Sequence, residues 1–262
     1  MLGRDSWLVR RLRPAYEQYL TWSSGGKGIP WTINGVPYRI HPKYRPQLGE
    51  FYDSPVAAYL RERVRPGDVC IDVGANVGVY VLQFAHWCAP NGRVIAFEPN
   101  PNARNALHEH VRMNRIGHRV DIVPAAVSDH IGQETLHAAE ADGMSRLGSP
   151  SSALEGKTAE IPVPVVTLDH FCRERSLEPD WLVIDIEGFE MAALAGGRNL
   201  IQSRGAKLGI IVEMHPDLWP TAKATRASAE ALLCELKRTP IPLTGQADPL
   251  RDYGIVALMP GG

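Results

Sequence analysis

Residues 69–80 read Val69-Cys70-Ile71-Asp72-Val73-Gly74-Ala75-Asn76-Val77-Gly78-Val79-Tyr80. The β-branched run 69–73 predicts a short buried strand, and the apolar segment 79–88 predicts a helix that follows a glycine-containing turn. In open α/β sheets, ligands bind beyond the carboxyl ends of the strands, and glycine lets the backbone approach a ligand without an intervening Cβ. We therefore expect this turn to hold a nucleotide-like ligand.

The spacing of the glycines narrows the type of ligand. A dinucleotide-binding turn requires Gly-x-Gly-x-x-Gly, but the position two residues after Gly74 is Asn76, which argues against NAD and FAD. The sequence also lacks the Gly-x-x-x-x-Gly-Lys-[Ser/Thr] phosphate loop. A ligand that contains adenosine but no phosphate fits better, and S-adenosylmethionine is such a ligand.

The next predicted strand, 94–97, supplies an acidic partner for this ligand. It is followed by Glu98-Pro99, about twenty residues beyond the glycine turn. A carboxylate at the end of that strand can accept hydrogen bonds from both hydroxyls of a ribose. We therefore expect Glu98 to bind the ribose.

Short apolar strands alternate with amphipathic helices along the chain, which predicts an α/β fold with a mostly parallel, twisted sheet and helices on both faces. Further strands are expected at 119–123, 181–186 and 208–212, and helices at 56–64, 103–114, 191–200 and 227–237. Segment 161–166 also has a strand pattern, but Pro162 and Pro164 require an edge position. Residues 138–160 are rich in Ser, Gly and Ala, and we expect a mobile loop, either a lid or a surface insertion.

The N-terminal residues are expected to form a separate unit. Apolar residues recur at helical spacing over the first twenty positions, and Asn34-Gly35 within the alternating segment 29–40 predicts a hairpin. The predicted organisation is a helix-and-hairpin cap at 1–54 and a main domain at 55–262. We expect the helix to pack on the main domain or on a second copy of the chain, as a homodimer, with a membrane surface as the alternative.

Composition excludes several classes of protein. Of 262 residues, 44% are hydrophobic and 22% are charged, which is typical of a soluble globular protein. The 28 Lys and Arg balance 29 Asp and Glu, which argues against a nucleic acid partner bound mainly through its phosphates. No segment reaches the roughly 18 apolar residues of a membrane span, and no secretory core is evident, so we expect a cytoplasmic protein. The four scattered cysteines predict neither a zinc site nor a disulfide framework.

Several motifs together resemble those of the FkbM-type methyltransferases, a family of Rossmann-like, class I, S-adenosylmethionine-dependent enzymes. They run in the family's order from about residue 48 to 216: Pro66-Gly67-Asp68, 71–78, Phe97-Glu98-Pro99, Ala126-Val127-Ser128-Asp129, Thr167-Leu168-Asp169, 184–190 and Val212-Glu213-Met214-His215-Pro216. The resemblance implies an O-methyltransferase domain at 55–262 that acts on a hydroxyl of a saccharide or small natural product.

The resemblance also assigns the cofactor-binding residues. It places the amino-acid end of S-adenosylmethionine and the turn at Asp72, Gly74, Ala75, Asn76 and Gly78, the ribose at Glu98 and Pro99, and the adenine near Ala126.

The chemistry requires a further set of residues. Methyl transfer to a hydroxyl is an in-line displacement, which needs alignment and the help of a base or a metal ion. Asp185 and Glu187 follow one predicted strand, and Glu213 and His215 follow the next, each pair two positions apart and so on one side of an extended segment. We expect His215 to be the general base, oriented by a neighbouring carboxylate, with Asp185, Glu213 and Glu187 as further catalytic residues.

Other interpretations of these residues remain open. Asp185 and Glu213 could instead bind Mg²⁺, which prefers oxygen ligands and would acidify the acceptor hydroxyl. The acids after 181–186 could also serve only as helix N-terminal residues. The chain could be a non-catalytic partner subunit that binds S-adenosylmethionine. Candidates for the acceptor pocket are Trp31, His41, Tyr52 and the segment 144–146.

Overall fold

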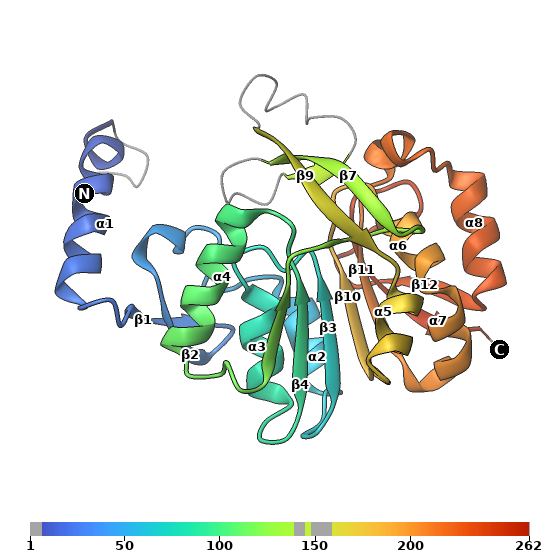
Figure 1. The fold of residues 1–262 in the computed structure, drawn as a ribbon, viewed down its shortest axis with the longest axis horizontal. Helices are drawn as coiled ribbons and strands as arrows, with labels where there is room; N and C mark the ends of the chain where they lie inside the picture. The colour runs from blue at the N-terminus through green and yellow to red at the C-terminus, as the bar shows by residue number, and fades with distance from the viewer. Residues whose placement is uncertain (1–6, 139–144, 148–158, 262) are drawn as a thin grey trace.

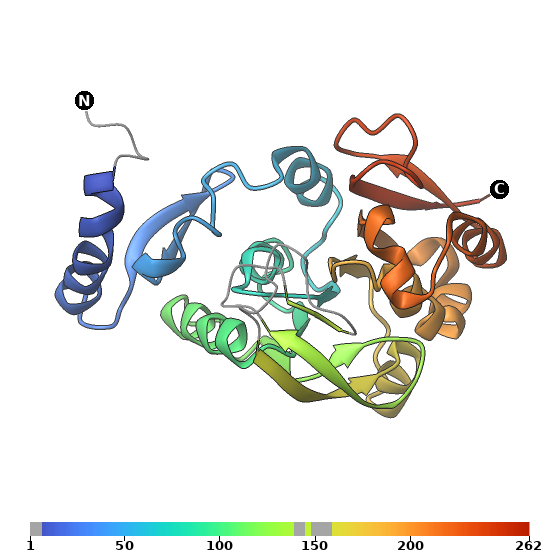
Figure 2. The same ribbon diagram turned by 90° about the horizontal axis from the view of Figure 1, so that it is seen from above.

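The computed structural model describes residues 7–138, 145–147 and 159–261. These residues form a seven-stranded sheet covered by helices, a smaller four-stranded sheet, and an N-terminal helix with a two-stranded hairpin (Figures 1 and 2).

The central sheet has the strand order β12-β13-β11-β10-β3-β4-β5. The five strands from β11 to β5 are parallel, as the alternation of strands and helices predicts. Their bounds are Val69–Val73 for β3, Arg93–Phe97 for β4, Val120–Val123 for β5, Trp181–Ile184 for β10 and Gly209–Met214 for β11. The expected α/β fold with a mostly parallel sheet is confirmed.

The other edge of the sheet differs from the sequence-based expectation. β13 (Gly254–Pro260) runs antiparallel to β11, and β12 (Arg238–Pro242) runs antiparallel to β13. Neither strand is expected from the sequence. Pro240 and Pro242 make the segment of β12 look unlike a strand in the sequence. Because β12 is the outermost strand of the sheet, residues without an N–H are tolerated there.

Helices cover both faces of the sheet, and the alternation of side chains along β3 shows the division. Ile71 and Val73 belong to the core beneath one helical layer, and Cys70 belongs to the core beneath the other. The first layer contains α5 (Leu168–Glu174), α6 (Glu190–Gly196), α7 (Arg198–Arg204) and α8 (Arg226–Glu235). The second contains α2 (Ser54–Arg61), α3 (Val79–Trp87) and α4 (Pro101–Met113). Short 3₁₀ helices are η1 (Pro42–Tyr44), η3 (Gly205–Lys207) and η4 (Pro216–Ala222).

The single helix expected over 191–200 is wrong, because the chain forms α6 and α7 with Gly197 between them. A Cβ on the preceding Gly196 would lie 2.0 Å from the carbonyl oxygen of Ser128. The end of α6 therefore packs directly on backbone of another segment, which only glycine permits.

A second sheet, of order β6-β9-β7-β8, lies beside the carboxyl ends of β3 and β4 (Figure 1). Its strands are β6 (Ala126–Val127), β7 (Gly132–Ala138), β8 (Arg146–Leu147) and β9 (Ala159–Val166). The edge position expected for 161–166 is wrong for the strand as a whole, since β9 pairs with both β7 and β6. Only Val165 and Val166 pair with β6, so Pro162 and Pro164 lie where β9 has one neighbour.

Much of the segment 138–160, for which we expect a mobile loop, lies outside the described residues, namely 139–144 and 148–158. Its two ends belong to β7 and β9, and β8 pairs with β7 through Leu136 and Leu147.

The N-terminal part contains α1 (Trp7–Ser23), β1 (Ile29–Ile33) and β2 (Val36–Ile40). The hairpin has the expected turn, with positive φ angles of 48° at Asn34 and 82° at Gly35. It does not stand apart from the main domain, since Ile33 and Ile40 share a core cluster with residues of α3 and α4. A division of the chain at residues 54 and 55 therefore stays a prediction.

Helix α1 lies at one side of the molecule (Figure 2). Several of its apolar side chains are exposed to solvent. Leu12, Tyr16, Tyr19 and Trp22 are all exposed. The guanidinium of Arg45 lies over the ring of Tyr16, 5.6 Å from the ring centroid. A homodimer through this helix stays a prediction.

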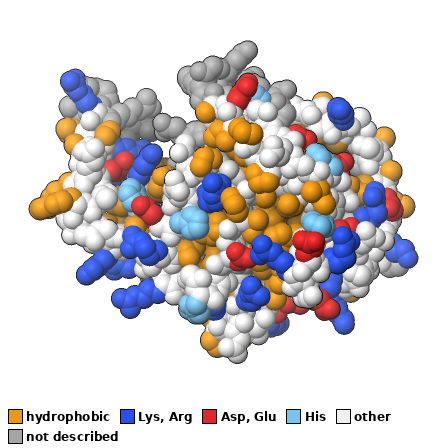
Figure 3. Space-filling model, viewed as in Figure 1, with side chains coloured by type: hydrophobic (Ala, Val, Ile, Leu, Met, Phe, Trp, Pro, Cys, Tyr) orange, Lys and Arg blue, Asp and Glu red, His pale blue; other side chains and the backbone are white. Residues whose placement is uncertain are grey.

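On the face drawn in Figure 3, acidic and basic side chains are interspersed, with hydrophobic side chains gathered near its centre. This distribution agrees with the balanced charge of the sequence. Among the described residues, no helix combines the length and the apolar character that a membrane crossing requires.

Gly74 allows the turn after β3 to pass close to the chain that leaves β10. β3 and β10 are parallel neighbours, and Gly74 has φ +89°. A Cβ at Gly74 would lie 1.8 Å from the carbonyl oxygen of Asp185, the residue that follows β10. The sequence suggests that this glycine serves the approach of a ligand, but packing of backbone on backbone already requires it.

We predict that Gly74→Ala lowers the free energy of unfolding by about 3 kcal/mol or more. The added Cβ would clash with the backbone carbonyl oxygen of Asp185, which cannot move aside as a flexible side chain can. Gly35→Ala is the matched control, since Gly35 has φ +82° and its added Cβ would meet no described atom within 4 Å. We expect the control to lose about 1–2 kcal/mol from its backbone angle alone. Urea unfolding measures both, and equal losses would contradict the packing argument.

Candidate active site

The polar residues singled out by the sequence converge at the carboxyl edge of the central sheet. β3 leads into the Gly74 turn, β4 into Glu98, β10 into Asp185, and β11 into His215. These strands are parallel and in register, so their ends meet although they are far apart in the sequence. The edge therefore combines a turn, two carboxylates and a histidine.

Backbone hydrogen bonds hold the turn that follows β3. The N–H groups of Gly74 and Ala75 both donate to the carbonyl oxygen of Phe97, each at 3.0 Å. Asn76 and Gly78 have positive φ angles of 46° and 99°, and Gly78 directly precedes α3. The turn is thus fixed against the end of β4 before any ligand binds.

Glu98 is buried, and backbone groups orient both of its carboxylate oxygens. Oε2 accepts a hydrogen bond from the N–H of Asn76, and Oε1 accepts one from the N–H of Asn100, each at 2.7 Å. Burial raises the pKa of Glu98 to about 7, against the opposing effect of these two hydrogen bonds. A carboxylate oxygen has two lone pairs, so each retains an acceptor position for a hydroxyl of a ribose.

Asp72 lies in β3, next to β4, and is 2% exposed. Burial, and then the charge of Glu98, raises the pKa of Asp72 to about 8. The side chain is therefore mainly protonated at neutral pH. It would act on a ligand as an uncharged hydrogen-bonding group.

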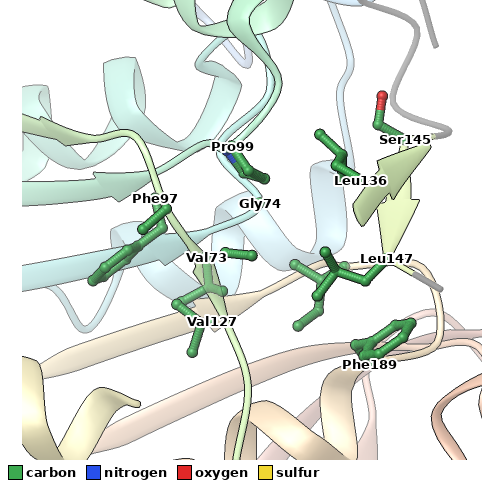
Figure 4. A pocket seen from close by; sticks show the side chains of 12 residues that line it. Val73, Gly74, Phe97, Pro99, Val127, Leu136, Ser145, Leu147 and Phe189 are labelled. Atoms are coloured by element: carbon green, nitrogen blue, oxygen red, sulfur yellow. The ribbon is translucent and has the colours of Figure 1, made fainter. Parts of the chain in front are cut away.

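An apolar pocket lies beside the turn (Figure 4). Its lining residues are Val73, Gly74, Phe97, Pro99, Ala125, Ala126, Val127, Leu136, Ser145, Leu147, Ile186 and Phe189. Gly74, Pro99 and Ala126, three of the predicted cofactor residues, thus share one pocket. In Figure 4, Leu136 of the small sheet and Phe189 lie on the side opposite Phe97. Walls of this kind suit a flat apolar ring system such as adenine.

Asp185 and Glu213 form a carboxylate pair with His215 beside them. One ligand atom from each of the three residues lies within 4.8 Å of the others. Burial raises the pKa of Asp185 well above its ordinary value, and the charge and hydrogen bond of Glu213 raise it further. Because two adjacent carboxylates resist simultaneous ionisation, this arrangement favours the protonated form of Asp185.

His215 has Glu190 as its hydrogen-bonded partner, rather than the Glu213 that the sequence suggests. Nδ1 of His215 lies 2.8 Å from Oε1 of the fully buried Glu190. Glu190 also accepts hydrogen bonds from the N–H of Gly188 at 2.7 Å and from Nε1 of Trp219 at 3.0 Å. Burial lowers the pKa of His215, but Glu190 and neighbouring carboxylates outweigh burial and raise it.

Glu187 lies in a turn, so the expected extended relation between Asp185 and Glu187 is wrong. Glu187 has φ 49° and Gly188 has φ 100°. The turn nevertheless directs Glu187 toward His215, with Oε2 4.0 Å from Nε2 of the imidazole. His215 therefore has one carboxylate on each side, one bonded to Nδ1 and one beyond hydrogen-bonding distance of Nε2.

Two residues outside every motif of the sequence also reach this cluster. Tyr253, which directly precedes β13, donates a hydrogen bond to Glu213, and its ring centroid lies 5.2 Å from that of His215. Asp53 precedes α2, and burial and then Glu213 raise its pKa. No local pattern could have indicated either residue, because their approach to Glu213 depends on the folded chain.

The candidates for an acceptor pocket separate in the structure. Tyr52 packs edge-on against Tyr80, with ring centroids 5.8 Å apart, and its pKa is raised by burial and then by Asp185. Trp31 instead donates to the carbonyl oxygen of Leu48 within the N-terminal part, and His41 packs there against Tyr44. In the segment 144–146, Ser145 lines the apolar pocket, and Met144 lies outside the described residues.

Comparison with known proteins identifies the family. The family model for the methyltransferase FkbM domain matches residues 72–236, more than half of the chain. The 31-O-demethyl-FK506 methyltransferase FkbM of Streptomyces tacrolimicus is 35% identical over 167 residues, which cover 53% of this chain and 63% of that relative. The hexuronic acid methyltransferase AglP of Haloferax volcanii is 27% identical over 179 residues, 68% of each chain. The match thus spans less than two thirds of the first relative's length.

A solved structure supports the fold. The S-adenosylhomocysteine-bound methyltransferase PaMTH1 of Podospora anserina has a TM-score of 0.51 at 10% identity, over 100% of this chain and 99% of that one. A methyltransferase FkbM of Methylobacillus flagellatus has a TM-score of 0.49 at 15% identity, over 78% of this chain and 50% of that one. The fold is the expected Rossmann-like, class I methyltransferase fold, and with the match over residues 72–236 the chain belongs to the FkbM methyltransferase family.

Proposed function

We propose that this protein transfers a methyl group from S-adenosylmethionine to a hydroxyl of a saccharide or small natural product. The arrangement along one sheet edge carries the proposal: an apolar pocket beside Glu98, and next to it a histidine paired with a buried carboxylate. The first part suits an adenosine, and the second suits a proton acceptor. Membership in the FkbM family supports methyl transfer.

The residues around the turn suit the nucleoside of S-adenosylmethionine. The pocket of Pro99 and Ala126 would hold the adenine, and Glu98 would accept hydrogen bonds from the ribose hydroxyls. The backbone from Gly74 to Gly78 would face the amino-acid end. When bound, the cofactor supplies the methyl group: the acceptor oxygen bonds to the methyl carbon as the methyl–sulfur bond breaks, and S-adenosylhomocysteine remains.

His215 is the proposed base for the hydroxyl proton. Nδ1 is engaged by Glu190, so Nε2 is the nitrogen that accepts this proton. The carboxylate of Glu190 lies next to the ring and would stabilise the imidazolium that forms. Burial and Glu213 raise the pKa of Asp185, so Asp185 is suited to donate a hydrogen bond to the acceptor, not to remove its proton.

The names of two relatives support a hydroxyl-bearing small molecule as acceptor. One relative is named for a demethylated FK506, a natural product, and the other for a hexuronic acid, a saccharide. The acceptor itself is part of the proposal.

A second candidate is a metal-assisted version of the same reaction. Asp185, Glu213 and His215 each offer a ligand atom within 4.8 Å of the others, and Mg²⁺ would compete with the proton that the raised pKa of Asp185 favours. Glu190 would then be the carboxylate partner of a metal-ligating histidine. Methyl transfer that stops in excess EDTA and returns with Mg²⁺ would favour this version, and full activity in EDTA would exclude it.

Two measurements separate the enzyme from a non-catalytic subunit that binds S-adenosylmethionine. Calorimetry with S-adenosylhomocysteine reports binding, and a radiolabelled methyl assay against a panel of hydroxyl compounds reports transfer. Binding with transfer supports the proposal. Binding without transfer to any acceptor favours the subunit, and no binding at millimolar concentration rejects both.

We predict that Glu98→Gln weakens S-adenosylhomocysteine binding about 10- to 100-fold, since hydrogen bonds to a charged carboxylate contribute about 1.5–3 kcal/mol. The wild type should also lose affinity as the pH falls below about 7, because Glu98 then gains a proton. The variant should lack this pH dependence.

Calorimetry across the pH range measures both effects. Glu62→Gln, which changes an exposed carboxylate directly after α2, is the control and should bind like the wild type. An unchanged affinity in Glu98→Gln would refute the assignment of Glu98 to the ribose.

We predict that His215→Gln lowers kcat about 100-fold or more and leaves S-adenosylhomocysteine binding within about twofold of the wild type. The wild-type rate should rise with pH as His215 loses its proton, with an apparent pKa above the ordinary value of about 6.5. Glu190→Gln removes the main charge that stabilises the imidazolium, so the acidic limb of its pH profile should move to lower pH.

An NMR titration of the histidine ring protons measures the same pKa without an acceptor, and the His215→Gln spectrum identifies the signal. The raised pKa also has a consequence for stability. The ion pair of His215 and Glu190 stabilises the fold below about pH 6.5, and this contribution is lost as the pH rises through the raised pKa. If the pKa of His215 is the same in the wild type and in Glu190→Gln, the assignment of Glu190 as the partner that raises this pKa is contradicted.

A further inference from the structure

Residues on either side of the matched family region meet at the proposed catalytic cluster. The match begins at residue 72 and ends at 236, whereas Asp53 lies before it and Tyr253 lies after it. Tyr253 donates a hydrogen bond to Glu213, and Asp53 accepts one from Tyr80, whose ring packs against that of Tyr52. Burial and then the charge of Glu213 raise the pKa of Asp53. The same cluster is thus completed by segments that the family match does not cover.

Asp53 is held in an unusual backbone conformation. Its angles, φ 40° and ψ 49°, lie in the left-handed region, which costs a residue with a Cβ about 1 kcal/mol or more. It precedes α2 but its side chain does not cap that helix, and it accepts a hydrogen bond from the hydroxyl of Tyr80 at 3.1 Å. Asn34, in the turn of the N-terminal hairpin, holds the neighbouring residue by donating from Nδ2 to the carbonyl oxygen of Tyr52 at 2.7 Å.

Tyr253 presents an aromatic surface next to the proposed base. It is 65% exposed although its ring packs on that of His215, with the two planes inclined at 53°. The hydrogen bond to Glu213 fixes the end of the ring. An exposed and fixed aromatic ring can stack on the C–H face of a sugar ring and can attract a cation.

The side chains around these two residues are acidic. Glu213 accepts the hydrogen bond of Tyr253, and the acidic groups that raise the pKa of Tyr253 after burial and this bond are Glu213, Asp185 and Asp53. The positive charge of His215 is already paired with Glu190. Anionic groups of an acceptor would be repelled here, whereas hydroxyl and ammonium groups would find hydrogen-bond acceptors.

On the basis of the methyl transfer proposed above, we propose that Tyr253 and Asp53 bind the acceptor and select an uncharged or amine-bearing polyhydroxylated ring over a uronic acid or a phosphate ester. Tyr253 contacts the face of the ring, beside Nε2 of His215. Asp53 accepts a hydrogen bond from a hydroxyl or ammonium group of the same ring. The specificity of the enzyme thus comes from segments outside residues 72–236, the region that matches the family model.

Three probes with the same sugar ring test the selection by charge: methyl glucoside, glucosamine and glucuronate. Saturation-transfer NMR on the full chain, saturated with S-adenosylhomocysteine, measures their binding. We expect methyl glucoside and glucosamine to bind at least about tenfold more tightly than glucuronate, because like charges repel across a partly desolvated site. Equal or tighter binding of glucuronate overturns the inference, as does binding of none of the three to a protein that binds S-adenosylhomocysteine. Failure to bind S-adenosylhomocysteine overturns the proposed function itself.

Variants of Tyr253 and Asp53 test whether these two residues determine the binding of the sugars. Tyr253→Ala should weaken methyl glucoside and glucosamine about tenfold or more, whereas Tyr253→Phe should retain most of the affinity because the ring remains. Asp53→Asn should weaken glucosamine more than methyl glucoside, since it removes a charge but keeps an acceptor oxygen.

Matched controls are Tyr19→Ala, which removes a 59% exposed ring on α1, and Asp129→Asn, which removes an exposed carboxylate. Both should leave sugar binding unchanged. S-adenosylhomocysteine affinity within about twofold of the wild type shows that each variant is folded. Unchanged sugar binding in both Tyr253→Ala and Asp53→Asn overturns the inference.

Discussion

The close approach of Gly74 to the carbonyl oxygen of Asp185 joins the two parts of the candidate site. Because β3 and β10 are parallel neighbours, the turn that would hold the cofactor and the acid that would face the acceptor leave the sheet side by side. A side chain at Gly74 would drive these segments apart. The close packing of the Gly74 turn on the chain that leaves β10 therefore depends on one residue without a Cβ.

Burial of several carboxylates at one edge is costly, and the structure resolves this in two ways. The pKa of Asp185 is raised by burial and by Glu213, which favours its uncharged form. Glu190 instead has three hydrogen-bonding partners, Gly188, Trp219 and His215, which compensate for its complete burial. The same acidic edge therefore places a protonated acid at Asp185 and a carboxylate beside His215, an arrangement that suits the acid–base catalysis proposed above.

The parallel part of the sheet could be predicted because its strands carry strong local patterns. Residues 94–97 form a continuous apolar run and residues 69–73 are apolar except for Asp72, and buried parallel strands have this pattern. β12 could not be predicted from the sequence, because its prolines are acceptable only in an edge strand. Which strand lies at the edge is decided only when the whole sheet has formed. The division of the helix at Gly197 likewise depends on what the chain packs against.

The sequence by itself determined the class of fold, the family, and the positions of Glu98, Asp185, Glu213 and His215 at strand ends, because these follow from patterns within short segments. Only the tertiary structure decided which of these residues meet and how they are charged. Glu190 as partner of His215, and the arrival of Asp53 and Tyr253 at Glu213, depend on contacts between segments far apart in the chain. Burial and neighbouring charge set protonation, and neither can be read from spacing along the sequence.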